Sequence, residues 1–296
     1  MNPTFDTDSL RAIVAGADLG SFARAAVQLG RSQSAISMQL KKLEQQAGTQ
    51  LFARQGRGLV PTEAGEALIA YARRIIALND EAALAVGATV STAVVRLGLP
   101  QDFFEDVLPA ALRAFSQEHP DVHVDIRVGE NHKLSEEIGG GRLDGAIAFF
   151  EEDAVKDGEL LCTLPMRWLA HETGRSAPLA DPVQLVMFDH PCLFRKAALS
   201  AFDRAQRRWR MSVTTPSLLY VWSALRSSLG VGVRTEHGLP HDIVCLDGAF
   251  GLPSLPSIEL RLLRSKNASS WAQDLCEVLR REAIRLIAPG GPRSAA

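Results

Sequence analysis

Residues 20–44 read GSFARAAVQLGRSQSAISMQLKKLE and residues 50–65 read QLFARQGRGLVPTEAG, and these two stretches decide the fold of the N-terminal part. Ser21 can cap a short helix, because a serine hydroxyl accepts a hydrogen bond from a free N–H of the first helical turn. Gly30 follows at a place where helices commonly end in the left-handed conformation. Ser32 can cap the next helix, so the first stretch predicts two short helices joined by a tight turn.

The helix after Ser32 has two different faces. Ile36, Leu40 and Leu43 recur at helical spacing and predict its buried face. The opposite face is polar, and Gln, Ser and Lys are side chains that hydrogen-bond to base edges or phosphates. Met38 lies on this face, where it either contacts a thymine methyl group or is a surface or packing methionine. The candidate DNA-contacting residues of this segment are Arg31, Ser32, Gln33, Ser34, Ser37, Met38 and Lys41.

A glycine-rich turn with two arginines follows this helix. Arg54 and Arg57 are predicted to lie on a short hairpin that reaches the sugar–phosphate backbone or the adjacent minor groove. Between residues 24 and 57 the chain carries six cationic side chains against one acidic one, Glu44, although its net charge is −2. Such a basic island is typical of a phosphate-binding surface. Residues 1–61 are therefore predicted to form an all-α winged helix-turn-helix that reads the major groove of DNA.

A long helix is predicted from Thr62 to about residue 90. Its apolar residues recur at alternating spacings of three and four, the heptad pattern by which two helices pair. The alternative is a helix that packs only on its own domain. We favour dimerisation because helix-turn-helix proteins usually bind DNA as dimers. The predicted dimerisation residues are Leu68, Tyr71, Ile75, Leu78 and Ala82.

These N-terminal residues resemble the LysR-type transcriptional regulators. The resemblance implies a linker helix used for dimerisation and a C-terminal domain that is built like a periplasmic binding protein and binds a small effector. The partners it implies are double-stranded DNA, an unidentified small-molecule effector, further copies of the chain in a homodimer or homotetramer, and RNA polymerase. Residues 100–109 further resemble the LrhA-like branch of the family. The matching motifs are SFxRAA at 21–26, SQSAIS at 32–37, LE at 43–44, LFxR at 51–54 and TEAG at 62–65.

The C-terminal part alternates short apolar runs with helical patterns, beginning after a small, Ser/Thr-rich segment at residues 87–93. This alternation implies crossover connections and parallel sheets, and thus the α/β class. We expect an effector-binding domain over residues 91–296 with two α/β subdomains and two chain crossings, near residues 166 and 265. Subdomain I is expected at about 93–166 and 266–290, and subdomain II at about 167–265. Strands are expected at 94–99, 122–128, 145–150, 160–170, 183–188, 211–214, 230–233 and 258–263.

Ligands of such sheets bind beyond the carboxyl ends of the strands. LysR-type proteins often place a Ser or Thr just after the first strand of this domain, where it helps to bind an anion. This chain has Gln101 and Asp102 there, and the acidic residue argues against a simple carboxylate effector. The candidate effector-binding residues are Gln101, Asp102, Glu130, Phe149, Thr214 and Thr215.

Motifs for other chemistries are missing from the sequence. The seven histidines form no HxxxH or HExxH pattern and the four cysteines form no CxxC pair, so we expect no metal site. GxSxG and nucleotide-binding motifs are also missing, which indicates no cofactor and no enzyme. The polar, acidic residues 1–8 predict no signal peptide, and no apolar run is long enough to span a membrane. We therefore expect a cytoplasmic protein.

Two further functions compete with DNA binding. A solute-binding module of a transport or sensing system would account for the C-terminal part, but not for the first 90 residues. An enzyme with a DNA-binding appendage has no catalytic constellation to support it. The sequence therefore predicts a sequence-specific DNA-binding transcriptional regulator whose activity responds to a small effector.

Overall fold

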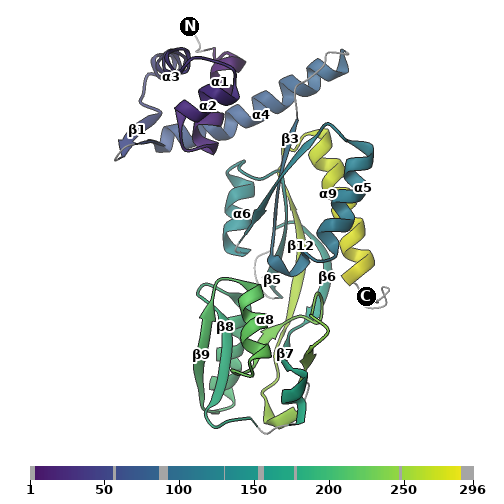
Figure 1. Cartoon of the computed structure of the whole chain (residues 1–296). Coiled ribbons are helices and arrows are strands. Elements are labelled where there is room, and N and C mark those ends of the chain that lie inside the picture. Colours follow the sequence, from purple (N-terminus) through teal and green to yellow (C-terminus); the bar gives the residue numbers. More distant parts are fainter. Residues whose placement is uncertain are drawn as a thin grey trace.

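The computed structural model describes residues 4–55, 58–86, 93–129, 131–152, 157–176, 179–246 and 249–287. Figure 1 shows a small helical unit at one end of the long helix α4, and below this helix a domain of two lobes, each built around a sheet. This arrangement agrees with the predicted N-terminal helix-turn-helix and C-terminal α/β domain.

The N-terminal unit has three helices and a two-stranded hairpin. Leu10 and Ile13 of the first helix pack with Leu43, Leu51 and Phe52, which are all buried. This core forms because one apolar face of each helix is turned inward. The elements are α1 (Thr7–Asp18), α2 (Phe22–Gln28), α3 (Gln33–Ala47), β1 (Phe52–Gln55) and β2 (Gly58–Pro61).

The predicted helix caps are confirmed. The hydroxyl of Ser21 accepts a hydrogen bond from the backbone N–H of Arg24, and that of Ser32 accepts one from Ala35. Gly30 has a φ of 61°, in the left-handed region that glycine adopts without strain. Local hydrogen bonding thus fixes both ends of the tight turn that precedes α3.

Helix α4 (Glu63–Ala85) begins in close contact with the hairpin. The hydroxyl of Thr62 donates to the carbonyl of Gln50 at 2.9 Å and accepts from the N–H of Gly65 at 3.1 Å. A Cβ atom at Gly65 would lie 1.9 Å from the carbonyl oxygen of Leu51, so only glycine fits there. The Thr-Glu-Ala-Gly motif therefore joins the start of α4 to the segment that leads into the hairpin.

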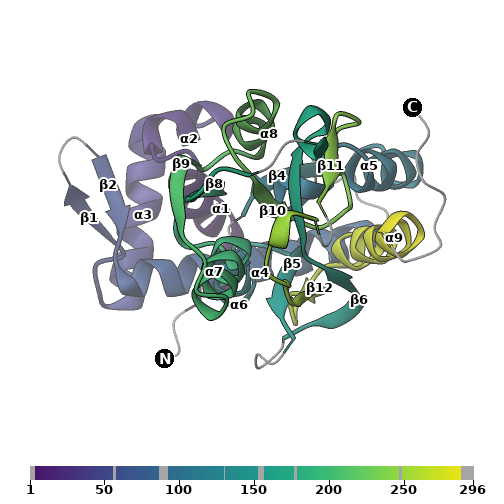
Figure 2. The same cartoon turned by 90° about the horizontal axis from the view of Figure 1, so that it is seen from below.

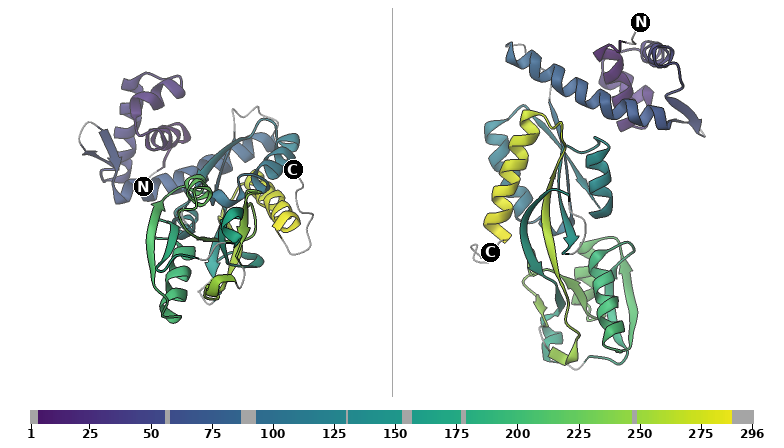
Figure 3. Two further views of the ribbon diagram at one scale, coloured as in Figure 1. Left: turned by 60° about the horizontal axis from the view of Figure 1, so that its bottom comes forward. Right: turned by 180° about the vertical axis from the view of Figure 1, so that it is seen from behind.

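Subdomain I is a five-stranded sheet with the order β4-β3-β5-β12-β6. Helices α5 (Val107–Glu118) and α9 (Ser270–Ile287) pack on one face, and α6 (Asn131–Gly139) packs on the other (Figures 1 and 3). Strands β3, β4 and β5 are parallel, whereas β12 is antiparallel to both of its neighbours. The strands are β3 (Val94–Leu99), β4 (His123–Val128), β5 (Gly145–Glu151), β6 (Glu159–Pro165) and β12 (Ser257–Arg264).

Two features of the predicted subdomain layout were wrong. The second crossing was expected near residue 265, but β12 already pairs with β5 and β6, so the chain re-enters subdomain I at Pro256. The single strand expected at 160–170 is two strands in different sheets, separated at Met166, where the first crossing lies. Apolar runs do not reveal which sheet a strand joins, because both subdomains contain strands with buried apolar side chains.

Subdomain II contains two small sheets that adjoin each other. Strand β7 (Arg167–His171) lies between β10 (Gly232–Arg234) and β11 (Ile243–Cys245), and β8 (Val183–Phe188) pairs in parallel with β9 (Trp209–Thr215). A single bridge between Leu185 and Val231 connects them. Figure 2 shows α7 (Leu193–Arg204) and α8 (Leu218–Arg226) beside these strands. Strand β11 was not predicted. Short helical turns lie at η1 (Gln101–Phe103), η2 (Glu172–Ser176) and η3 (Ala249–Gly251).

Candidate nucleic-acid interface and effector cleft

The outer face of α3 carries an exposed row of polar side chains. Gln33, Ser34 and Lys41 are exposed, whereas Ile36 and Leu43 on the opposite face are fully buried. Met38 is 67% exposed, so it does not pack within its own chain. An exposed helix face of this composition has the size and chemistry to enter the major groove.

Some of the predicted DNA-contacting side chains already have partners within the chain. The hydroxyl of Ser32 caps α3, and the hydroxyl of Ser37 donates to the carbonyl of Gln33 at 2.9 Å. Arg31 lies 3.2 Å from the carboxylate of Asp8, and both side chains are exposed. Exposed pairs of this kind are weak and screened by salt, so a phosphate can replace Asp8.

The hairpin is held to α3 by a carboxylate. Glu44 accepts hydrogen bonds from the backbone N–H groups of Leu51 and Phe52, at 2.9 and 3.3 Å. Arg54, in the strand that follows, is exposed. Glu44 therefore orients the arginine-bearing strand relative to α3, a role that the Leu-Glu motif alone does not reveal. The predicted DNA-contacting residue Arg57 lies outside the described residues.

Helix α4 presents an apolar stripe to solvent. Tyr71, Ile75 and Leu78 are 58%, 41% and 67% exposed, and Ala82 is exposed as well. Leu68, the first residue of the predicted seam, instead packs against the helix-turn-helix core of its own chain. The exposed stripe is therefore Tyr71, Ile75, Leu78 and Ala82, hereafter the α4 stripe.

The DNA-binding unit also contacts subdomain I through charged groups. Asp18, at the end of α1, accepts a hydrogen bond from Arg73 of α4 and lies 3.5 Å from Arg96 of β3. The side chain of Arg73 is only 8% exposed, and its pKa is lowered by burial and then by the nearby Arg96. One carboxylate thus holds two guanidinium groups at the place where the N-terminal unit, the linker helix and the effector domain meet.

Gln101 connects the two subdomains. Its side-chain oxygen accepts a hydrogen bond from the backbone N–H of Leu218, at the start of α8, at 2.7 Å. Its side-chain nitrogen donates to the carbonyl of Pro216 at 3.4 Å. The amide therefore occupies a helix N-terminus, which is a place that also attracts anions.

A buried ion pair lies next to this connection. Arg234 Nε in β10 is 3.5 Å from Asp102 Oδ1, and the two side chains are 6% and 9% exposed. The guanidinium carbon of Arg234 lies 4.1 Å from the ring centre of Phe188 and 4.6 Å from that of Phe194. Asp102 was predicted from sequence, whereas Arg234 was missed, although it directly follows the strand expected at 230–233 and the strand-end rule could have found it.

The other predicted effector-binding residues differ in their surroundings. Phe149 is buried and its ring contacts Phe103 and Phe194, so it forms part of the wall between the subdomains. Thr215 is buried and its hydroxyl accepts from the N–H of Ser217 at 3.2 Å. Thr214 is exposed. Glu130 lies outside the described residues.

Comparisons with known proteins agree with this geometry. The model of the bacterial regulatory helix-turn-helix protein, lysR family, matches residues 7–66, and that of the LysR substrate binding domain matches residues 89–283. The chain belongs to the lysR family. This LysR-family chain is 34% identical over 259 residues to the HTH-type transcriptional regulator DgdR of Burkholderia cepacia, covering 88% of this chain and 87% of DgdR. The LrhA-like branch stays a prediction.

Solved structures share the fold of this LysR-family chain. ArgP from Mycobacterium tuberculosis has a TM-score of 0.71 at 20% identity, with 99% of this chain and 100% of ArgP covered. Full-length CbnR in complex with its target DNA has a TM-score of 0.56 at 19% identity, with 94% and 100% covered.

The family makes the chain a transcriptional regulator, not an enzyme. In the part of the chain that the structure describes, no group of three His, Cys, Asp or Glu side chains could hold a metal ion. None of its described helices is long and apolar enough to cross a membrane.

Proposed function

We propose that this LysR-family regulator acts in the cytoplasm as a dimer. In this proposal α3 contacts the bases of DNA and the hairpin contacts its phosphates. The observation that carries the proposal is the exposed polar face of α3 beside the exposed Arg54 of β1. Gln33, Ser34 and Met38 face the bases in this arrangement, and Arg31, Lys41 and Arg54 bind phosphates. The likeness to the CbnR–DNA complex supports the same orientation of the fold on DNA.

The second element of the proposal is the α4 stripe as the dimer interface. Apolar side chains in a continuous stripe are costly to leave in water and pair well with an identical helix. A dimer of this kind holds two copies of α3 at a fixed separation, as two half-sites in successive turns of DNA require. Tetramers and a contact with RNA polymerase are further expectations from the family.

The third element is an effector that binds between the subdomains. Gln101 and the Asp102–Arg234 pair lie at their junction, and ligand binding there has to compete with the contacts that close it. An effector shifts the regulator between two arrangements only if it binds one of them more tightly. Replacement of Gln101 by Ala should therefore change the effector response without changing DNA affinity in the absence of effector.

The DNA-binding test is fluorescence anisotropy with the duplex upstream of the chain's own gene and with a scrambled duplex, over a range of salt concentrations. Arg54→Ala should reduce the affinity for both duplexes by the same factor. It should also reduce the slope of log K against log salt by about 0.9, because one phosphate is no longer neutralised. Gln33→Ala should cost about 1–3 kcal/mol at one base pair and leave the slope unchanged.

Arg208→Ala is the matched control, because Arg208 is an exposed arginine in subdomain II that pairs with Asp181. It should leave affinity and slope unchanged. Equal losses of affinity for Arg54→Ala and Arg208→Ala would show that net charge, rather than the hairpin, decides the binding. Identical sequence profiles for Arg54→Ala and Gln33→Ala would contradict the division into phosphate and base contacts.

A further inference from the structure

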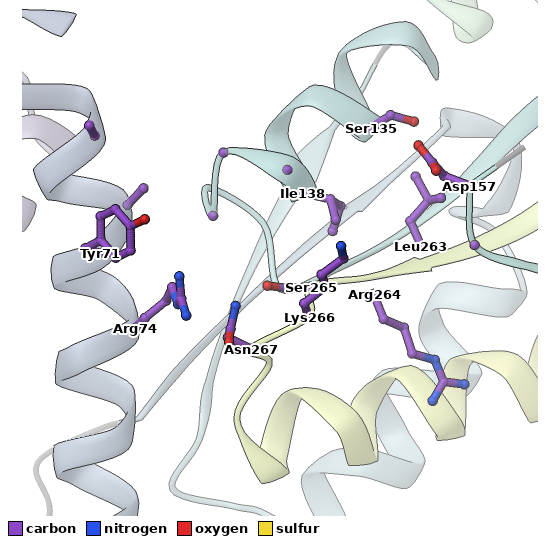
Figure 4. A pocket seen from close by; sticks show the side chains of 16 residues that line it. Tyr71, Arg74, Ser135, Ile138, Asp157, Leu263, Arg264, Ser265, Lys266 and Asn267 are labelled. Atoms are coloured by element: carbon purple, nitrogen blue, oxygen red, sulfur yellow. The ribbon is translucent and has the colours of Figure 1, made fainter. Parts of the chain in front are cut away.

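A cavity of about 560 Å³ lies between the linker helix and subdomain I, away from the junction of the two subdomains (Figure 4). One wall is α4, and the opposite wall is formed by the end of α6 and by the loop that joins β12 to α9. Small-molecule sites in proteins typically measure about 300–1,000 Å³. The cavity therefore has room for a small organic ligand that would contact the linker helix and the effector domain together.

Part of this cavity is apolar. Ala67 and Ala70 line it from α4, and Ile138 and Leu263 line it from subdomain I. A Cβ atom at Gly141 would lie 3.6 Å from the Cβ of Ala70, so an alanine at position 141 would close the gap between the two walls at this end. Leu263 is buried, but a ligand with an apolar body would replace water along the exposed parts of Ala67, Ala70 and Ile138 and gain free energy by doing so.

The charged lining is mainly cationic, and two of its cations have no carboxylate partner. No carboxylate of the described residues lies within 4 Å of Arg74 or of Lys266, whereas Arg264 is 3.1 Å from Glu159 and 3.5 Å from Glu277. Arg74 instead lies against the ring of Tyr71, at 5.2 Å from its centre.

The two unpaired cations come from opposite walls. Arg74 extends from α4 toward the loop that carries Ser265, Lys266 and Asn267 (Figure 4). A hydroxyl and an amide can both donate hydrogen bonds to an anion, and Lys and Arg supply the charge. Asp157 is the acidic residue of the described lining and belongs to subdomain I. Arg74 and Asn267 point toward one another, whereas the amino group of Lys266 points into the cavity toward Ile138 (Figure 4).

We propose that this cavity binds a small organic anion, a carboxylate or a phosphate ester with an apolar body. The anionic group binds Arg74 of the linker helix and Lys266 of the effector domain, and the apolar body lies against Ala67, Ala70 and Ile138. Because the two cations belong to different parts of the chain, a bound anion fixes the angle between the linker helix and the effector domain. This site is separate from the junction at Gln101 and goes beyond the proposed function.

The test is isothermal titration calorimetry of the full chain with benzoate, phenyl phosphate, benzyl alcohol and inorganic phosphate. Benzoate or phenyl phosphate should bind saturably at one site per chain, and the tighter of the two identifies the anionic group. Benzyl alcohol, which lacks the charge, and inorganic phosphate, which lacks the apolar body, should each bind at least about tenfold more weakly.

Variants separate this site from other anion-binding places. Arg74→Gln and Lys266→Gln should each weaken binding of the organic anion by about tenfold, because each removes one charge-assisted hydrogen bond. Arg208→Gln removes an exposed arginine elsewhere, and Gln101→Ala alters the junction of the subdomains. Both should leave the affinity unchanged.

Three results would overturn the proposal. The first is no saturable binding of either organic anion. The second is binding that survives in both Arg74→Gln and Lys266→Gln. The third is inorganic phosphate that binds as tightly as phenyl phosphate, since the apolar walls would then contribute nothing. None of these results bears on DNA binding, which the anisotropy measurement tests separately.

Discussion

Replacement of Leu78 by Gln tests whether the α4 stripe holds two copies of the chain together. Leu78 is 67% exposed and lies in the third quarter of α4. Gln has nearly the same helix propensity as Leu, so the helix itself should keep its stability. The substitution therefore changes the apolar surface of the stripe and little else.

The expected effect follows from the exposed fraction. Complete burial of a leucine side chain contributes about 2 kcal/mol, and burial of the exposed two thirds of Leu78 contributes about 1.3 kcal/mol. A twofold dimer contains this residue twice, which doubles the destabilisation to about 2.6 kcal/mol. Since each 1.4 kcal/mol is a factor of ten, the dimer dissociation constant should rise by about a hundredfold.

Sedimentation equilibrium over a range of protein concentrations measures this constant directly. Leu219→Gln is the matched control, because Leu219 is 63% exposed but lies on α8, away from the stripe. DNA affinity should fall with dimerisation in Leu78→Gln and stay constant in Leu219→Gln. An unchanged dimer in Leu78→Gln, or an equally weakened one in Leu219→Gln, would refute the assignment of the interface to α4.

Three further results are expected. Asp18→Asn should lower the free energy of unfolding by about 2 kcal/mol, because the buried Arg73 loses a charge-assisted hydrogen bond. Hydrogen exchange at the start of β3 should also become faster. Asp181→Asn, which alters an exposed pair, should change neither quantity. Lys42 lowers the pKa of Asp6 to about 2. The ionised Asp6 therefore stabilises the fold fully above its ordinary pKa of 3.8, and this stabilisation is lost as the pH falls through 2. In Lys42→Gln, NMR titration should show a higher pKa for Asp6. Burial raises the pKa of Cys276 to about 12, so iodoacetamide should leave this thiol unmodified in the native chain at pH 8, and rapid alkylation would contradict its burial.

The helix-turn-helix could be predicted closely because its signals are local. Ser21 and Ser32 each accept a hydrogen bond from the backbone N–H three residues further along the chain. Gly30 and Gly48 follow the last residues of their helices and adopt the left-handed conformation. Each of these interactions lies within a few residues of sequence, so spacing alone reveals it. The exposed face of α3 followed from the same periodicity.

The effector domain was less predictable because its partners are distant in sequence. Leu260 of β12 lies opposite Phe149 of β5 and Cys162 of β6. An apolar run in the sequence does not indicate which strands will be its neighbours in the sheet. The Asp102–Arg234 pair and the Asp18–Arg73 pair likewise join residues that no motif relates. Sequence periodicity therefore predicted most elements of this domain, but neither its second crossing nor its buried charges.

The two chain crossings have a mechanical consequence. Strands β6 and β12 lie side by side, and where they leave subdomain I the N–H of Met166 donates to the carbonyl of Pro256 at 3.2 Å. Two adjacent strands joined at one level act as a single pivot, so the lobes can swing about one axis but cannot slide apart. Gln101 and the Asp102–Arg234 pair join the subdomains away from that pivot, so these contacts have to break before the lobes can swing apart.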